Sequence, residues 1–150
     1  MNPFTDEYFM KQALAEARLA EEEDEVPVGA VIVSGNLIIA RAHNQTERLN
    51  DPTAHAEMLA ITSATVALGA KYLTDCRIYV TIEPCVMCAG AIGWAQLAAL
   101  IYGAPDEKRG FTMFAPRALY SKTEIRNGIL ETECAALMKA FFREKRSYFS

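Results

Sequence analysis

The chain has 150 residues, which is the size of one domain and enough to bury a hydrophobic core without disulfide bonds. Hydrophobic residues make up 51% and charged residues 23%, a balance typical of globular proteins that excludes an intrinsically disordered chain. The net charge of -4 argues against a surface coated with lysines that bind nucleic acid, although it allows a local basic patch.

The N-terminal residues lack a basic segment followed by an apolar stretch, so no signal peptide is visible. The four cysteines do not have the spacing of a secreted disulfide framework. Together these features predict a cytoplasmic protein. Residues 84–102 carry no charge and approach membrane-spanning length, but their cysteines, glycines and alanines better fit a buried helix that runs into a buried strand. We therefore expect no membrane span.

Hydrophobic periodicity predicts an α/β protein. Helices are expected at about 3–22, 52–68, 84–94 and 132–146. Strands are expected at 26–33, 37–42, 77–82 and 97–102. Gly35-Asn36 is typical of a two-residue hairpin turn, and residues 103–122 form a polar loop of the length that often carries function. This order predicts one domain over residues 1–150 with a mixed sheet, because the hairpin is antiparallel and the later strands are linked by helices.

Several side chains have ordinary structural explanations. The acidic run from Glu21 to Glu25 ends the first expected helix, and we expect it on a solvated surface. Cys76 and Cys134 are expected to be small buried residues. Trp94 is expected in the core rather than stacked on a nucleobase.

Two short segments combine metal-binding and acid–base residues: Pro-Thr-Ala-His-Ala-Glu at 52–57 and Glu-Pro-Cys-Val-Met-Cys at 83–88. In each, a proline suited to the first turn of a helix precedes the key residues. Cys85 and Cys88 are three residues apart, so their sulfur atoms share a helix face and can bind one ion. Unpaired N–H groups at the helix start favour the thiolate form that binds metal. With His55, they form a Cys₂His set that suits zinc.

This ligand set predicts catalysis. Three protein ligands leave one tetrahedral position for water, as in catalytic zinc sites. Glu57, two residues after His55, is placed to take a proton from that water and pass it to a leaving amine without binding the metal. His-x-Glu with Pro-Cys-x-x-Cys is the signature of zinc-dependent nucleobase deaminases. We therefore expect one zinc ion per subunit, with Glu57 as the catalytic residue, and release of ammonia from the ring carbon that bears the amine.

Beyond these motifs, the sequence resembles the cytidine/deoxycytidylate deaminase superfamily, and most closely its bacterial tRNA adenosine deaminases. The resemblance covers most of the chain and is carried by residues 25–30, 40–44, 52–57, 79–91, 128–130 and 141–143. It implies a three-layer α/β/α sandwich with a five-stranded mixed sheet, and a homodimer. It also implies conversion of adenosine to inosine at the wobble position of a tRNA anticodon stem-loop.

The same resemblance implies substrate contacts from four segments. In this resemblance, Asn44 contacts the target nucleotide and Val28 lines the pocket of its base. Asp106 and Lys108 contact the ribose and the backbone. Phe142 and Arg143 lie on the C-terminal helix that packs by the flipped anticodon. Flipping an unpaired loop base costs little, and stacking on an aromatic ring helps to hold it. After Gly110 the chain departs from the family's usual pattern. The role of residues 110–122 stays open between a lid, an RNA contact and part of the dimer.

Two other functions remain open from the sequence. One is a small-molecule deaminase acting on guanine, cytosine or a free nucleoside, since residues 91–95 are faintly similar to guanine deaminases. The other is a non-catalytic interaction module stabilised by zinc, with a fourth ligand from Cys76, Cys134 or His43. If His43 is not a ligand, we expect it to hydrogen-bond near the site. A Cys-x-x-Cys pair taken alone, here Cys85 and Cys88, is also compatible with a redox pair.

Overall fold

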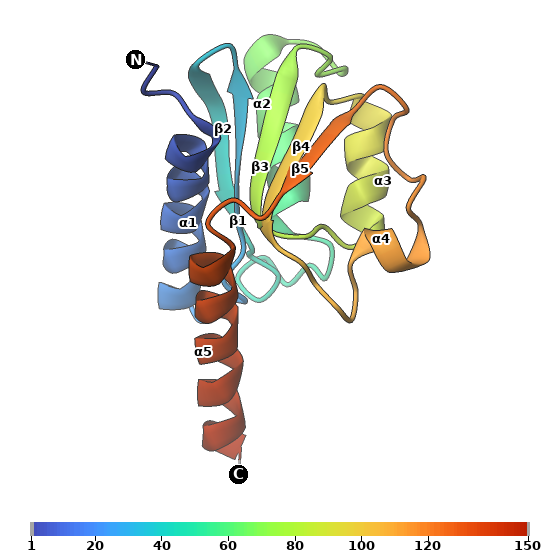
Figure 1. The fold of residues 1–150 in the computed structure, drawn as a ribbon. Helices are drawn as coiled ribbons and strands as arrows, with labels where there is room; N and C mark the ends of the chain where they lie inside the picture. The colour runs from blue at the N-terminus through green and yellow to red at the C-terminus, as the bar shows by residue number, and fades with distance from the viewer. Residues whose placement is uncertain (1, 150) are drawn as a thin grey trace.

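The computed structural model describes residues 2–149, which fold into one sheet with helices on both faces (Figure 1). In chain order the elements are α1 (Asp6–Glu22), β1 (Gly29–Ser34), β2 (Leu37–His43), α2 (Ala56–Leu68), β3 (Cys76–Ile82), α3 (Val86–Ala95), β4 (Ala99–Ala104), α4 (Phe111–Phe114), β5 (Glu124–Asn127) and α5 (Glu131–Phe149).

The sheet has five strands in the order β2-β1-β3-β4-β5. Strand β1 is antiparallel to both β2 and β3, whereas β3, β4 and β5 are parallel. The β1–β2 hairpin turns at Gly35, whose φ of 62° is one that glycine adopts without strain. The predicted mixed sheet is therefore confirmed, and the predicted hairpin is present.

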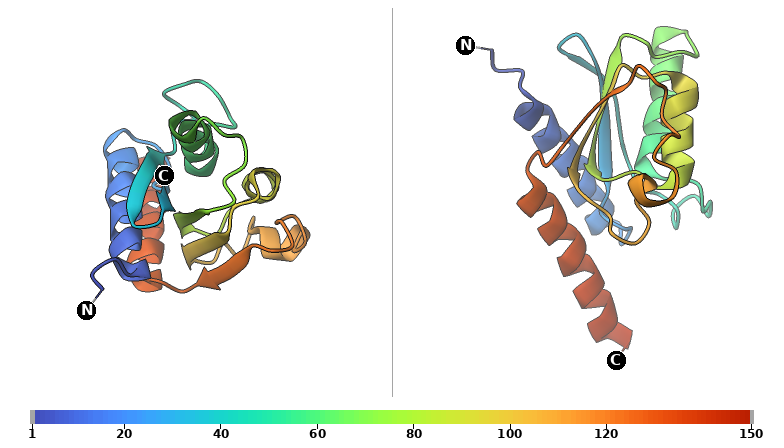
Figure 2. Two further views of the ribbon diagram at one scale, coloured as in Figure 1. Left: turned by 90° about the horizontal axis from the view of Figure 1, so that it is seen from above. Right: turned by 45° about the vertical axis from the view of Figure 1, so that its right-hand side comes forward.

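The sheet is the middle of three layers. Helices α1 and α5 cover one face, while α2 and α3 cover the other (Figure 2). The central strands supply fully buried side chains to both interfaces, among them Ile32, Ile78 and Leu100. Helix α1 adds Phe9 and Met10, which are also fully buried. This arrangement confirms the three-layer α/β/α sandwich.

The two prolines of the motifs lie before their helices, not in the first turn as predicted. Helices α2 and α3 begin at Ala56 and Val86, so that His55 and Cys85 are the N-cap residues. Before α2, Asp51 accepts a hydrogen bond of 2.8 Å from the backbone N–H of Thr53, and this local turn keeps the segment non-helical. Before α3, Cys85 pairs with Gly110 in a β-bridge, which keeps the chain extended.

Two expectations about exposure are wrong. Glu25 belongs to the acidic run predicted to be solvated, yet it is 1% exposed, because its carboxylate accepts hydrogen bonds from a neighbouring loop. Trp94 was expected in the core but is 84% exposed, because α3 turns Cys88, Ile92 and other residues inward and leaves Trp94 on its outer side. The predicted burial of the two remaining cysteines is confirmed, each being 1% exposed.

The uncharged stretch at 84–102 forms α3 and the first part of β4. Across residues 2–149, no helix combines the length and the apolar character that crossing a membrane requires. The expected polar loop at 103–122 contains the end of β4 and the short helix α4. Strand β5 forms an edge of the sheet, and its side chains are mostly exposed.

Candidate active site

The candidate site lies at the edge of the sheet where β2, β3 and β4 end, at the lower end of the sheet in Figure 1. The starts of α2 and α3 meet there. The Nδ1 atom of His55 lies 3.7 Å from Sγ of Cys85 and 3.5 Å from Sγ of Cys88. All three ligand atoms lie within 4.8 Å of one another. Segments that are 30 residues apart in the sequence thus bring three metal-ligating atoms together.

The chemistry of these donors fits a divalent cation. Contact with the Cys88 thiol, and then with His55, lowers the pKa of Cys85 to about 4, whereas the same contact raises the pKa of Cys88. One thiolate therefore forms readily, and thiolate with imidazole is a donor set that zinc prefers. The backbone N–H of Cys88, in the first turn of α3, also lowers the pKa of Cys85, as expected from the unpaired N–H groups at a helix start.

A fourth protein ligand is not close by. Within residues 2–149, the three residues named above are the only metal-binding group of His, Cys, Asp or Glu. His43 lies between two carboxylates instead, with Nδ1 3.1 Å from Glu16 and Nε2 2.9 Å from Glu23. His43 therefore hydrogen-bonds to α1 and its C-cap residue and does not join the ligand group. The arrangement favours an open, catalytic coordination sphere over a closed structural one.

Glu57 lies in the first turn of α2 and is 4% exposed. Burial raises the pKa of its carboxyl group to about 7. Its neighbours in the site are His55, Cys85 and Cys88. A carboxyl group with a pKa near neutral can both accept and release a proton during one reaction.

Asn44 supports the start of α2. Its Oδ1 accepts a hydrogen bond of 2.7 Å from the backbone N–H of Ala56, and the backbone N–H of Asn44 donates to the carbonyl of Val28 at 3.2 Å. Both Asn44 and Val28 are buried. The N-cap residue His55 makes no side-chain capping bond, so its imidazole remains free for a metal. The structure therefore brings Asn44 and Val28 together beside the start of α2, which holds His55 and Glu57.

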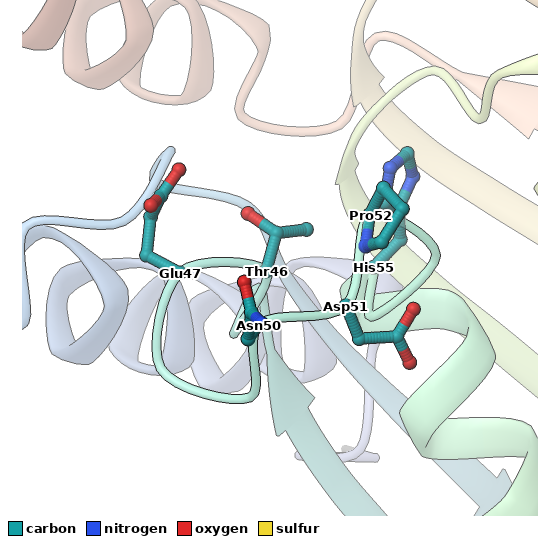
Figure 3. A pocket seen from close by; sticks show the side chains of 6 residues that line it. All are labelled: Thr46, Glu47, Asn50, Asp51, Pro52 and His55. Carbon is teal, nitrogen blue, oxygen red and sulfur yellow. The ribbon is translucent and has the colours of Figure 1, made fainter.

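A cavity of about 400 Å³ opens beside His55 (Figure 3). It is lined by Thr46, Glu47, Asn50, Asp51, Pro52 and His55. Glu47 and His55 lie on opposite sides of this cavity, with Thr46 between them (Figure 3). The loop beneath is held by the buried Glu25, which accepts hydrogen bonds from the backbone N–H groups of Glu47 at 3.0 Å and Arg48 at 2.8 Å.

The loop after β4 carries Asp106 and Lys108. Asp106 uses Oδ1 to accept hydrogen bonds of 3.0 Å from the backbone N–H groups of Lys108 and Arg109, so its carboxylate organises its own loop. Lys108 is exposed. The loop is tied to the zinc-ligand segment by Glu83, a buried residue that sequence reasoning did not single out. The only signal for it was its place directly before the Pro-Cys-x-x-Cys motif.

Phe142 and Arg143 lie on α5 and do not line the cavity. Phe142 is 43% exposed and packs edge-to-face against Phe141, with ring centroids 5.3 Å apart. Helix α5 extends beyond the edge of the sheet at which the candidate site lies (Figure 1). The structure thus leaves these two residues apart from the group around His55.

The sequence pattern of the cytidine and deoxycytidylate deaminase zinc-binding region matches residues 3–104. The chain belongs to this family. A tRNA-specific adenosine deaminase of Agrobacterium fabrum is 46% identical over 144 residues, which cover 93% of this chain and 95% of that protein. The resemblance identified from the motifs is therefore confirmed, and the family's zinc is the cofactor of this deaminase.

Solved structures give the same fold. One, from work on A-to-I editing by tRNA:A34 deaminases at the wobble position of transfer RNA, has a TM-score of 0.81 and 44% identity, covering 87% of this chain and 98% of its own. A guanine deaminase from Bacillus subtilis has a TM-score of 0.64 and 45% identity, covering 70% of this chain and 66% of its own. Both substrate classes considered from the sequence are thus found among close relatives.

Proposed function

We propose that this deaminase converts adenosine to inosine at the wobble position of a tRNA anticodon. The observation that carries the proposal is the meeting of His55, Cys85 and Cys88 with the buried Glu57 beside an open cavity. A relative that matches 93% of this chain is by name a tRNA-specific adenosine deaminase, and supports this substrate over smaller ones.

In this proposal, His55, Cys85 and Cys88 hold one zinc ion per subunit. Zinc bound there supplies a Lewis acid that activates water near neutral pH. Glu57 accepts a proton from the attacking water and donates it to the leaving amine, so that its carboxyl group ends the cycle as it began. Its burial keeps bulk water from exchanging that proton.

The substrate contacts are also part of the proposal. Asn44 and Val28 line the base pocket, Asp106 and Lys108 hold the ribose and backbone, and Phe142 with Arg143 receives the rest of the anticodon loop. Since Oδ1 of Asn44 is engaged by Ala56, its Nδ2 group is left to donate a hydrogen bond to the nucleotide. An exposed Phe142 offers a surface on which an unpaired base can stack.

To test this proposal, zinc-loaded protein is incubated with a tRNA that carries a wobble adenosine, and separately with adenosine, guanine, cytosine and cytidine, and deamination of each is measured. We expect inosine in the tRNA, and a rate lowered about 10²–10⁴-fold in Glu57→Gln, the usual effect of losing an acid–base group. Glu7→Gln, an exposed glutamate on α1, is the matched control and should retain the wild-type rate. Absence of all turnover by fully loaded protein would favour the non-catalytic zinc module.

Guanine is the substrate of the second candidate function. The observation in its favour is the 45% identity to a guanine deaminase, although that match covers only 70% of this chain. Turnover of guanine without turnover of tRNA would keep the zinc chemistry and replace the tRNA assignment.

We further propose that the protein is a cytoplasmic homodimer in which α3 and α4 face the second copy. No charged residue occurs in α3, and a helix that is apolar all round is normally buried. Its outer side nevertheless exposes Trp94 and Val86, and the adjoining α4 exposes Met113 and Phe114. Part of the open question about residues 110–122 is then answered, since α4 would belong to the dimer.

A further inference from the structure

Glu83 is a buried carboxylate whose hydrogen bonds all run to one loop. It is 5% exposed and lies directly before Pro84 and the zinc-ligand candidate Cys85. Its Oε1 accepts a bond of 3.1 Å from the backbone N–H of Asp106. Its Oε2 accepts bonds of 3.1 Å from the backbone N–H and 2.7 Å from the hydroxyl of Thr112. Both ends of the 106–112 loop are therefore attached to a single side chain.

The backbone reinforces this attachment. The N–H of Phe111 donates to the carbonyl of Pro84 at 2.9 Å, and Cys85 forms a β-bridge with Gly110. Gly110 lies so close to Glu83 that a Cβ atom there would be 2.2 Å from its carboxylate oxygen. Any side chain at residue 110 would displace the carboxylate. The loop is thus packed against Glu83 as well as bonded to it.

Between the two attached ends, the loop carries two adjacent cationic side chains, which follow the exposed Glu107. The exposed Lys108 and Arg109 donate their backbone N–H groups to Oδ1 of Asp106, whose own N–H is held by Glu83. A continuous chain of hydrogen bonds therefore runs from Glu83, two positions before a zinc-ligand candidate, to two cationic residues. Lysine and arginine are the side chains that neutralise phosphates in nucleic-acid complexes.

We propose that Glu83 is a positioning residue, which fixes Lys108 and Arg109 relative to the zinc ligands so that they receive a phosphate of the RNA backbone. This inference rests on the proposed tRNA substrate. Glu83 makes no contact with the reacting atoms. It acts through the 106–112 loop, so that a phosphate bound by the loop places the adjacent nucleotide at the metal.

Glu83→Gln tests the inference, because the amide replaces one acceptor with a donor that faces the N–H groups of the loop. We expect KM for the tRNA to rise about tenfold, with kcat and zinc content near wild type. We also expect the slope of log KM against log salt to fall by about 1–2, since phosphate contacts set that slope. Lys108→Ala combined with Arg109→Ala should produce the same changes and add little to Glu83→Gln.

Two further variants complete the design. Thr112→Val removes only the hydroxyl donor, and should give a smaller change in the same direction even if Glu83→Gln folds poorly. Asp75→Asn, an exposed acidic residue before the opposite end of β3, is the control and should behave as wild type. Hydrogen exchange provides a readout that needs no activity, because the amides of Asp106 and Thr112 should exchange faster in Glu83→Gln.

The two proposals fail in different ways. If wild-type protein does not deaminate tRNA, the proposed function fails whatever the variants do. If wild-type protein is active but Glu83→Gln leaves KM and the salt slope unchanged, the role of Glu83 is overturned alone. A loss of zinc that accounts for the whole loss of activity would also overturn it, since Glu83 would then support the metal site and not the RNA.

Discussion

The Oδ1 atom of Asn44 lies 2.7 Å from the backbone nitrogen of Ala56, between the two key residues of α2. This bond joins the end of β2 to the start of α2 and fixes His55 and Glu57 on either side of it. It also engages the carbonyl oxygen of Asn44, which leaves the Nδ2 group to donate to a substrate. The Asn44 side chain thereby supports the start of α2 through its oxygen and offers a hydrogen-bond donor to the substrate through its nitrogen.

Variants at Asn44 separate these two roles. Asn44→Asp keeps an oxygen for Ala56 but loses the donor, so we expect kcat/KM to fall at least tenfold with little change in thermal stability. Asn44→Ala loses both, and the unpaired N–H of Ala56 should cost about 1–3 kcal/mol of unfolding free energy. Steady-state kinetics and urea unfolding measure the two effects. Equal losses of stability in both variants would contradict the separation.

Zinc binding should depend on Cys88 and not on the other buried cysteines. Cys88→Ala removes one of three ligand atoms, so we expect zinc content to fall from one ion per chain to almost none, with a lower Tm. Cys134→Ala is the matched control, because Cys134 is equally buried but lies on α5 outside the ligand group. It should keep its zinc, as measured by elemental analysis. Zinc retained by Cys88→Ala would refute the assigned ligand set.

The ligand set could be predicted because two short motifs carry it. Their residue types are specific to the chemistry, although the prolines misplaced the starts of α2 and α3 by a few residues. The order of helices and strands was similarly accessible, since β1, β3 and β4 are buried apolar runs. Strand β5 could not be predicted from hydrophobic periodicity, because its Glu-Ile-Arg-Asn residues are mostly exposed at the edge of the sheet and lack a hydrophobic pattern.

The loops that shape the site were beyond sequence reasoning. Glu25 and Glu83 look like ordinary surface glutamates, yet both are buried because neighbouring loops offer them backbone N–H groups. Such bonds join residues more than 20 positions apart, and no local pattern specifies them. The prediction for Trp94 was wrong for the opposite reason, since a large aromatic residue is usually buried, whereas this one is 84% exposed on the outer side of α3.

Glu25 should stabilise the loop that lines the cavity. Its carboxylate accepts bonds from Glu47 and Arg48, and from the hydroxyl of Thr46 at 3.3 Å. Glu25→Gln leaves buried donors poorly paired, so we expect a loss of about 1–3 kcal/mol in unfolding free energy. Glu22→Gln, in the same acidic run but exposed, should change stability by less than about 0.5 kcal/mol. Urea unfolding of both variants checks the difference, and matching stabilities would contradict it.

Asp6 should make stability depend on pH. Its carboxylate accepts bonds from Arg126 at 2.8 and 3.0 Å and from the hydroxyl of Tyr79 at 2.7 Å, joining α1 to β5 and β3. The hydrogen bond with Arg126 is the main cause that lowers the pKa of Asp6 in the folded protein. A lowered folded-state pKa stabilises the fold above the unfolded-state pKa of about 3.9, and this contribution is lost as pH falls through the folded value.

The comparison with Asp6→Asn isolates this contribution, since all other groups titrate alike in both proteins. We expect wild type to be more stable by about 1–2 kcal/mol at pH 7, with the difference shrinking steadily below pH 5. Urea unfolding at several pH values measures it. A difference that stayed constant down to pH 3, or grew, would show that Asp6 stabilises the fold without its charge.

Trp94 should control assembly if the outer side of α3 is the dimer interface. It is 84% exposed, on a helix that carries no charge. Tryptophan residues at the centre of an interface typically contribute 2 kcal/mol or more, and an introduced charge there would also lose its hydration. We therefore expect Trp94→Glu to weaken the dimer at least about 30-fold, so that it sediments as a monomer at micromolar concentration.

Leu37→Glu is the control, because Leu37 lies at the β1–β2 hairpin and is 68% exposed, and this variant should remain dimeric. If wild type is itself monomeric, the homodimer proposal is wrong, and if both variants stay dimeric, another face holds the two copies together.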